Sequence, residues 1–233
     1  MQQDRQEIQQ FLRKACHDLR THLRSVRANS ELLLRNPELG GEEHKQVLGF
    51  VIDGAAGANT LVEAISNYAA ALEIRPNPAP ISSGMLLRNA LAKLAKDISA
   101  SGAEVTYGDL PSVEGDPDRL LQLFENLVRN AVDHRGEQSP RIHVDATRQN
   151  GNWLFSVRDN GPGIDPDDLE RIFRPFERAS RERPGLGLAI CRGIVEAHSG
   201  TISVANRSDG GACFTMRLPI VAGNPTARME GAA

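Results

Sequence analysis

The chain has 233 residues, a formal charge of −3, and 40% hydrophobic and 24% charged residues. This composition is that of a folded soluble protein of one or two domains, and it excludes a disordered chain, which would be less hydrophobic and more highly charged. Aromatic residues make up only 4%. The scarcity of rings and the acidic balance disfavour a nucleic-acid-binding protein, which uses basic residues for phosphates and rings for base stacking.

No apolar run reaches the roughly 18–20 residues that cross a bilayer. The N-terminal MQQDRQEIQQ is polar and lacks the apolar core of a signal peptide. The cysteines Cys16, Cys191 and Cys213 lie far apart, with neither disulfide nor metal-site spacing. We therefore expect a cytoplasmic chain, or the cytoplasmic part of a longer protein, with reduced cysteines and no membrane segment.

The first third of the chain predicts two long helices. Residues 6–35 contain neither Gly nor Pro, and Asn36-Pro37 ends this helix because the residue before a proline disfavours the helical region. Seam positions that step alternately by four and three residues form a heptad pattern; they are Leu12, Cys16, Leu19, Leu23, Val26, Ser30 and Leu33. In the second helix the same pattern runs through Val47, Val51, Gly54, Ala58, Leu61, Ile65, Tyr68 and Leu72.

These helices predict an antiparallel hairpin. Two helices alone cannot bury a wide apolar face, so we expect a homodimer in which two hairpins form a four-helix bundle. Gly49, Gly54 and Gly57 each cost about 1 kcal/mol relative to Ala inside a helix. The sequence leaves two explanations open for these glycines, namely close approach of the first helix or a pliable second helix.

A connector with three prolines, Arg75–Pro80, marks a domain boundary. Beyond it we expect helices at 85–100, 116–134, 168–173 and 187–199, and strands at 104–107, 111–114, 141–146, 153–158, 201–206 and 212–218. Together they predict an α+β fold, with a mixed sheet covered on one face by helices. The expected domains are a helical hairpin (1–75), a linker (76–80) and an α/β sandwich (81–220), followed by a frayed tail (221–233).

His17-Asp18 is the first candidate site. The heptad register places His17 beside the seam, on a flank open to solvent. The Asp18 carboxylate can hydrogen-bond one ring nitrogen and raise the reactivity of the other, which makes His17 a candidate nucleophile. The alternative is an ordinary solvated surface histidine.

Three further signals lie in the second domain. Asn126 and Asn130 are four residues apart and share a helix face, where amide oxygens suit a hydrated Mg²⁺. Asp159 ends a strand and can accept a hydrogen bond from an exocyclic amine such as that of adenine, while the glycines of Gly161-Pro162-Gly163 let backbone approach a flat ligand. Gly185-Leu186-Gly187-Leu188 opens a helix whose N-terminus suits phosphate. Each of these three segments also has an ordinary structural explanation. In the same order, these are a solvent-exposed helix face, a turn between strands, and glycines that mark the start of a helix.

The order and spacing of these signals resemble the bacterial sensor histidine kinases, from about residue 6 to residue 219. Residues 17–24 are similar to the family's H box, residues 122–134 to its N box, and Asp159-x-Gly161-x-Gly163 to its G1 box. Phe173 and Phe176 are similar to its F box and Gly185-x-Gly187 to its G2 box. The resemblance implies a dimerisation and histidine-phosphotransfer hairpin followed by an ATP-binding domain of the Bergerat fold.

The resemblance also implies roles. His17 would take the γ-phosphoryl group of ATP, with Asp18 orienting the ring, and would pass it to an Asp of a response regulator receiver domain. Asn130, helped by Asn126, would hold Mg²⁺, and Asp159 would recognise the adenine amine. The remaining implied ATP-binding residues are Asp133, His134, Gly161, Gly163, Ile164, Phe176, Gly185, Leu186, Gly187 and Leu188. Thr21, four residues after His17, matches the family pattern for dephosphorylating the response regulator, so a second, phosphatase activity is a hypothesis.

Several positions depart from the family pattern. His22 replaces a usual proline, and Asp133 replaces a lysine that would face the phosphates. The lid before Gly185 is short and rich in arginines, which either replace that lysine or form a solvated loop; they are Arg174, Arg178, Arg181 and Arg183. Two alternatives therefore stay open. One is a phosphotransfer or scaffold protein with a degenerate ATP domain, and the other is a serine kinase of the anti-sigma type. Asn126 stands where gyrase-like ATPases carry a catalytic Glu, which favours a kinase over a hydrolase.

Overall fold

The structure is a computed structural model that describes residues 2–36, 40–72, 79–175 and 185–220, without the side chains of 2–14 and of a few residues near the end of the second helix. It divides into two compact units, Met1–Asn67 and Tyr68–Ala233. Residues 76–78 of the expected linker and the expected tail at 221–233 lie outside the described residues, so the domain bounds stay predictions.

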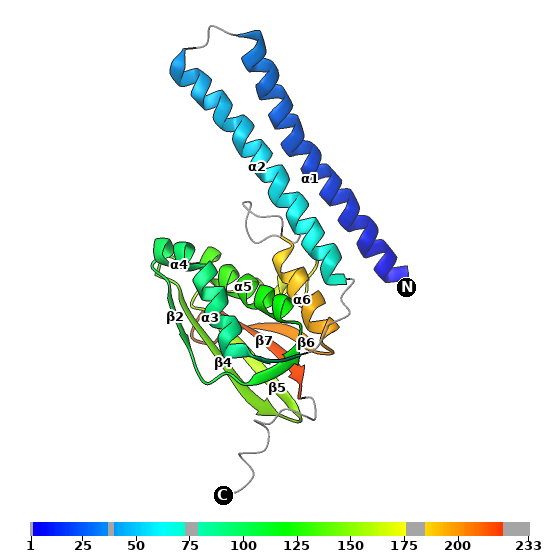
Figure 1. Cartoon of the computed structure of the whole chain (residues 1–233), viewed down its shortest axis with the longest axis vertical. Coiled ribbons are helices and arrows are strands. Elements are labelled where there is room, and N and C mark those ends of the chain that lie inside the picture. Colours follow the sequence, from blue (N-terminus) through cyan, green and yellow to red (C-terminus); the bar gives the residue numbers. More distant parts are fainter. Residues whose placement is uncertain (1, 37–39, 73–78, 176–184, 221–233) are drawn as a thin grey trace, which may run out of the picture. The chain divides into compact units, whose positions relative to one another are not determined.

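The first unit is a helical hairpin. Helix α1 (Gln2–Arg35) runs antiparallel to α2 (Gly41–Leu72) (Figure 1). Gly54 and Gly57 of α2 face α1 closely: a Cβ atom at Gly54 would lie 2.9 Å from Val26 Cγ2, and one at Gly57 would lie 2.5 Å from the His22 ring. Close helix approach therefore explains these two glycines, whereas Gly49 has no neighbouring atom within 4 Å of such a Cβ.

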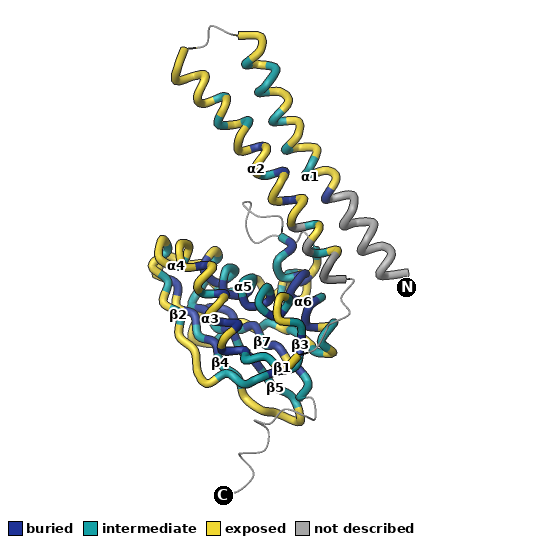
Figure 2. Tube along the Cα trace, in the orientation of Figure 1, coloured by how far each residue is buried: buried dark blue, intermediate teal, exposed yellow. Residues whose placement is uncertain are grey.

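The predicted seam is only partly buried within one chain. Gly54, Ala58 and Leu61 of α2 are buried. In α1, however, Cys16 and Leu23 are exposed, contrary to the expected inward orientation. The reason is geometric, because a single partner helix covers one side of a seam and leaves the other side open. Figure 2 shows the resulting exposed stretches along both helices.

The second unit is an α+β sandwich, as predicted. Its five-stranded sheet has the order β2-β4-β5-β7-β6, in which only β2 and β4 are parallel. The strands are β2 (Glu104–Tyr107), β4 (Arg141–Gln149), β5 (Asn152–Arg158), β6 (Thr201–Asn206) and β7 (Ala212–Pro219). The helices are α3 (Ser83–Lys93), α4 (Ala95–Ser101), α5 (Pro117–Asp133) and α6 (Gly187–Ala197). Strands β1 (Ala79–Ser82) and β3 (Ser112–Gly115) form a separate antiparallel pair.

Alternation along the strands explains why helices cover one face of the sheet. Buried apolar residues on that face include Val144, Phe155 and Phe214, which lie on three adjacent strands. Phe155 meets Phe124 of α5 edge to face at 6.2 Å between ring centroids. Helix α5 packs in turn between α3 and α6. The helices α3, α5 and α6 lie together on one side of the sheet (Figure 1).

Two local predictions were wrong, and the structure also contains a strand that was not expected. The helix expected at 85–100 is two helices separated at Leu94, a fully buried residue with φ −90° and ψ 6°. The helix expected at 168–173 is instead a 3₁₀ turn, Pro166–Asp168, whose start is capped by the Asp165 side chain. The end of the expected linker, Ala79-Pro80, belongs to β1, because it pairs with Glu114 and Gly115 of β3.

Candidate functional site

His17 lies on α1 with its side chain 79% exposed. Its Nδ1 atom lies 3.2 Å from Oδ1 of Asp18. A ring that donates its Nδ1 proton to this carboxylate leaves Nε2 unprotonated and open to solvent. The Thr21 hydroxyl donates to the His17 carbonyl oxygen at 3.1 Å, within the helix backbone. The predicted exposed His–Asp pair is therefore present, with one ring nitrogen available.

A cavity of about 350 Å³ lies in the second unit. Seven of the predicted ATP-binding residues line it: Asn130, Asp133, His134, Asp159, Gly163, Ile164 and Leu188. They come from the end of α5, the turn after β5 and the start of α6, which the sheet and helix packing bring together. Five other predicted residues are not among its lining: Asn126, Gly161, Gly185, Leu186 and Gly187. Phe176 lies outside the described residues.

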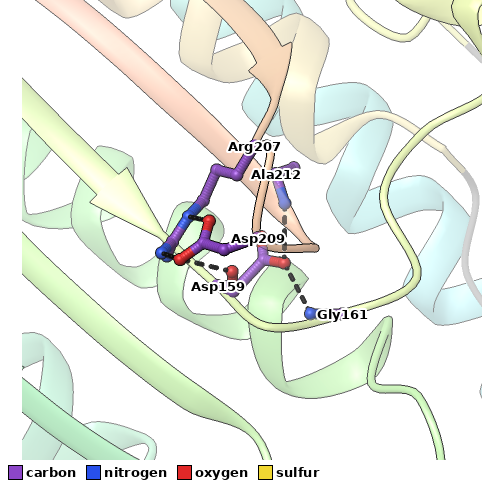
Figure 3. A network of polar contacts seen from close by, with 5 residues as sticks. All are labelled: Asp159, Gly161, Arg207, Asp209 and Ala212. Carbon is purple, nitrogen blue, oxygen red and sulfur yellow. Dashed lines mark hydrogen bonds and ion pairs between the residues drawn. The ribbon is translucent and has the colours of Figure 1, made fainter.

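Asp159 is the polar group at the centre of the turn that follows β5, and it is 92% buried (8% exposed). Its Oδ1 atom accepts hydrogen bonds from the backbone N–H of Gly161 (2.9 Å) and of Ala212 (3.1 Å), as Figure 3 shows. Among the described residues, none donates a hydrogen bond to the second carboxylate oxygen, Oδ2. The backbone thus fixes one oxygen and leaves the other for a donor on a ligand.

Gly161 and Gly163 let the turn pack closely against neighbouring segments of the protein, whereas the predicted approach to a flat ligand stays a prediction. A Cβ atom at Gly161 would lie 2.7 Å from the His134 carbonyl oxygen, at the end of α5. Gly163 has φ +79°, a left-handed conformation that glycine adopts without strain. Both glycines allow close contact between the turn and neighbouring segments, and Gly163 also lines the cavity.

The two asparagines of α5 point to different surroundings. Asn130 lines the cavity and offers an amide oxygen there. Asn126 donates from Nδ2 to the Gly187 carbonyl oxygen at 3.4 Å, so it links α5 to the start of α6. Within the described ranges no group of three or more His, Cys, Asp or Glu side chains forms a metal site. Asn130 carries an amide oxygen, a ligand type that suits a Mg²⁺ ion whose other ligands are phosphates and water.

Two basic residues on the cavity lining were missed from the sequence: Arg135, just after α5, and Arg171, after the 3₁₀ turn. They line the same cavity as Asp133, and Arg171 forms an ion pair with Asp168 at 3.5 Å. Asn206 at the end of β6 was also missed, although it hydrogen-bonds to both backbone groups of Ile164. No local pattern in the sequence marks these residues, because their roles depend on segments that meet only in the fold.

Residues 115–222 match the family of histidine kinase-, DNA gyrase B- and HSP90-like ATPases. The chain is 35% identical over 219 residues to the phytochrome-like protein Cph1 of Synechocystis, covering 92% of this chain and 29% of that protein. It is 30% identical over 207 residues to the sensor histidine kinase ZraS of Escherichia coli K12, covering 88% of this chain and 44% of that protein. The chain thus spans less than half the length of these curated relatives.

Solved structures agree with this fold. Full-length ShkA in complex with AMPPNP superposes with a TM-score of 0.66 at 27% identity, over 93% of this chain and 46% of that one. Histidine kinase ThkA, in complex with the response regulator protein TrrA, superposes with a TM-score of 0.73 at 23% identity, over 94% of this chain and 64% of that one. The likeness to ThkA concerns the fold alone.

These matches extend through the hairpin as well as the ATPase domain. The chain has the core of a sensor histidine kinase. As a sensor histidine kinase core it combines an ATP-binding domain with a helical hairpin that carries an exposed histidine. No helix in the described part of this histidine kinase core is both long and apolar enough to span a bilayer.

Proposed function

We propose that this chain transfers the γ-phosphoryl group of ATP to Nε2 of its own His17, and then to an aspartate of a response regulator receiver domain. The observation that carries the proposal is the exposed His17, whose Nδ1 is paired with Asp18, in a chain that also has the cavity around Asp159 and Asn130. We also propose that the chain acts in the cytoplasm.

The His–Asp pair suits nucleophilic attack. Asp18 holds the Nδ1 proton, so the Nε2 lone pair is directed to solvent and the positive charge that develops on the ring is neutralised. In the reaction Nε2 attacks the γ-phosphorus, the bond from that phosphorus to the β–γ bridging oxygen breaks, and ADP leaves. Phosphoryl transfer of this kind depends mainly on positioning and on charge neutralisation.

The cavity suits an adenine nucleotide. Asp159 is nearly buried, and its Oδ2 atom, which has no donor among the described residues, is available to an exocyclic amine; Gly163 and Ile164 line the same cavity. Asn130 would hold Mg²⁺, which when bound neutralises charge on the phosphates. Asn126 lies on α5 and donates a hydrogen bond to the first residue of α6, Gly187. This contact supports an indirect role, in which Asn126 holds the start of α6 against α5. Arg135 and Arg171 are basic residues on the same cavity lining, which supports a site for a phosphate-bearing ligand even though position 133 is an aspartate.

Two further parts of the proposal concern partners and the reverse reaction. The hairpin has large exposed apolar side chains on both helices, which supports homodimerisation; they are Leu23, Leu32, Leu34, Leu48, Phe50, Ile52 and Val62. Thr21 lies one helical turn after His17 with an exposed hydroxyl, which supports a phosphatase activity towards the response regulator. A Thr21→Ala variant that kept full phosphatase activity would contradict the proposed role of Thr21 in that activity.

The deciding experiment is incubation of the full chain with γ-labelled ATP and Mg²⁺. We expect a label that is lost in acid and retained in base, which is the behaviour of phosphohistidine and not of phosphoserine. His17→Ala should abolish the label, whereas the matched control His44→Ala, which removes another exposed histidine of the hairpin, should retain it. Acid-labile label on the His17→Ala variant would contradict the proposal. Nucleotide binding is measured separately by calorimetry, and wild-type protein that fails to bind ATP would favour the degenerate scaffold.

A further inference from the structure

The turn between β6 and β7 lies against the turn that carries Asp159, although the two are far apart in sequence. Asn206 is the last residue of β6, and its side chain bonds to both backbone groups of Ile164, 42 residues earlier. Oδ1 accepts from the Ile164 N–H at 2.8 Å, and Nδ2 donates to the Ile164 carbonyl oxygen at 2.6 Å. One side chain thus fixes both the position and the rotation of a peptide segment that lines the cavity.

Glycines on both turns make this approach possible. A Cβ atom at Gly163 would lie 3.0 Å from Asn206 Oδ1, so the amide reaches Ile164 only past a residue without a side chain. A Cβ atom at Gly211 would lie 2.0 Å from the carbonyl oxygen of Asp159, a distance that leaves no room for any side chain. Gly211 also has φ +82°. The close contact between the two turns therefore depends on a glycine in each of them.

The same β6–β7 turn also holds Asp159 itself. The backbone N–H of Ala212 donates to Asp159 Oδ1, and the Asp159 N–H donates to the Ala212 carbonyl oxygen at 3.0 Å. Arg207 donates from Nη1 to the Asp159 carbonyl oxygen at 3.4 Å and is itself held by an ion pair with Asp209 (Figure 3). We call residues 206–212 the bracket, because they contact the Asp159–Ile164 turn at its first and its last residue.

We propose that the bracket sets the base selectivity of the nucleotide site, with Asn206 as its positioning residue. This inference rests on the proposed function, since it takes ATP as the ligand. Adenine carries an amine donor where guanine carries a carbonyl acceptor. A carboxylate oxygen held at that edge attracts the first and repels the second, so the discrimination depends on how firmly Asp159 and Ile164 are held.

Asn206→Ala removes both hydrogen bonds to Ile164 and lets the turn relax. We expect the dissociation constant of ATP to rise about fivefold, which corresponds to about 1 kcal/mol, the net worth of one hydrogen bond. The dissociation constant of GTP should change less, because GTP gains little from a firmly held carboxylate. The dissociation constant of GTP divided by that of ATP, measured by calorimetry, should therefore fall. Asn206→Asp, which keeps the acceptor but places a carboxylate against the Ile164 carbonyl, should not restore it.

The matched control is Asn152→Ala. Asn152 also bonds from Nδ2 to a turn carbonyl, that of Asn150 at 2.9 Å, but in the β4–β5 turn, which is not among the residues that line the cavity. We expect it to leave the ratio unchanged. General destabilisation would reduce the binding-competent fraction equally for both nucleotides and would also leave the ratio unchanged. An unaltered ratio in Asn206→Ala, with wild-type protein binding ATP normally, would overturn the inference but not the proposed function.

A second readout needs no nucleotide. Amide hydrogen exchange of Ile164 in the ligand-free chain should be at least about fivefold faster in Asn206→Ala, because its N–H loses the partner that protects it. Exchange of the Ile142 amide, inside β4, should not change. If Ile164 exchanges equally fast in both proteins, Asn206 does not hold the turn and the inference fails. Wild-type protein that binds neither nucleotide would overturn the inference and the proposed function together.

Discussion

The Cys191 thiol is fully buried in α6, and this burial raises its pKa from near 9 to about 12. Below about pH 9 the thiol is neutral in the folded and the unfolded chain alike, so it adds no pH dependence. Between about pH 9 and pH 12 only the unfolded chain ionises, and the free energy of unfolding falls as pH rises, by at most about 1.4 kcal/mol per unit.

Urea unfolding at about pH 8.5 and about pH 10.5 tests this prediction. The fall in the free energy of unfolding should be smaller in Cys191→Ala than in the wild type. Cys16→Ala, which removes an exposed thiol, should show the full fall. Equal falls in all three proteins would show that the Cys191 thiol ionises as easily in the folded state as in the unfolded one.

Residues differed in how far the sequence could predict their roles. Asp159 and Gly163 belong to a short motif with a physical reason for each member, and both line the cavity. Asn126 shares a helix face with Asn130 in the same way, yet its amide bonds to Gly187, 61 residues later. A helical repeat indicates which residues lie on one face but not which neighbour that face meets. The positions of Asp159 and Gly163 at the cavity could therefore be predicted from the sequence, whereas the contact of Asn126 could not.

At the scale of elements, the contact between α1 and α2 depends on small residues. Gly57→Ala adds a Cβ atom that would lie 2.5 Å from the His22 ring. We expect this clash to lower the free energy of unfolding by about 1–3 kcal/mol relative to Gly49→Ala, where the added methyl meets nothing within 4 Å and helix propensity alone gains about 1 kcal/mol.

Thermal unfolding followed by circular dichroism measures both variants. The double variant Gly57→Ala/His22→Ala removes the ring that causes the clash, so it should recover most of the loss attributed to the added methyl. If Gly57→Ala instead stabilises the hairpin as much as Gly49→Ala does, the close approach at this position carries no energetic weight.

At the scale of the whole molecule, we expect a second copy of the chain to cover the exposed apolar residues of the hairpin. Leu23 is 53% exposed and Ile52 is 59% exposed, on α1 and α2 respectively. We expect a dimer, with twice the monomer mass of 25.3 kDa by light scattering. Leu23→Glu should give the monomer mass while calorimetric ATP binding persists, because the cavity lies in the second unit.

The control for this prediction is Met85→Glu. Met85 is 52% exposed on α3, in the second unit, and charging it should leave the dimer intact. A Leu23→Glu variant that keeps the dimer mass would contradict this prediction, because the dimer would then form through another face of the hairpin or through the second unit.

The sequence by itself determined the order and type of most elements, the exposed His17–Asp18 pair and the motifs of the ATP-binding domain. Periodicity, caps and turn residues act over a few positions, so a linear pattern carries them. Tertiary structure decided which distant segments meet. Three contacts join residues tens of positions apart: the hydrogen bond of Asn126 to α6, the hydrogen bonds of Asn206 to Ile164, and the pairing of β1 with β3. Such contacts depend on the packing of the sheet and its helices, which no local pattern specifies.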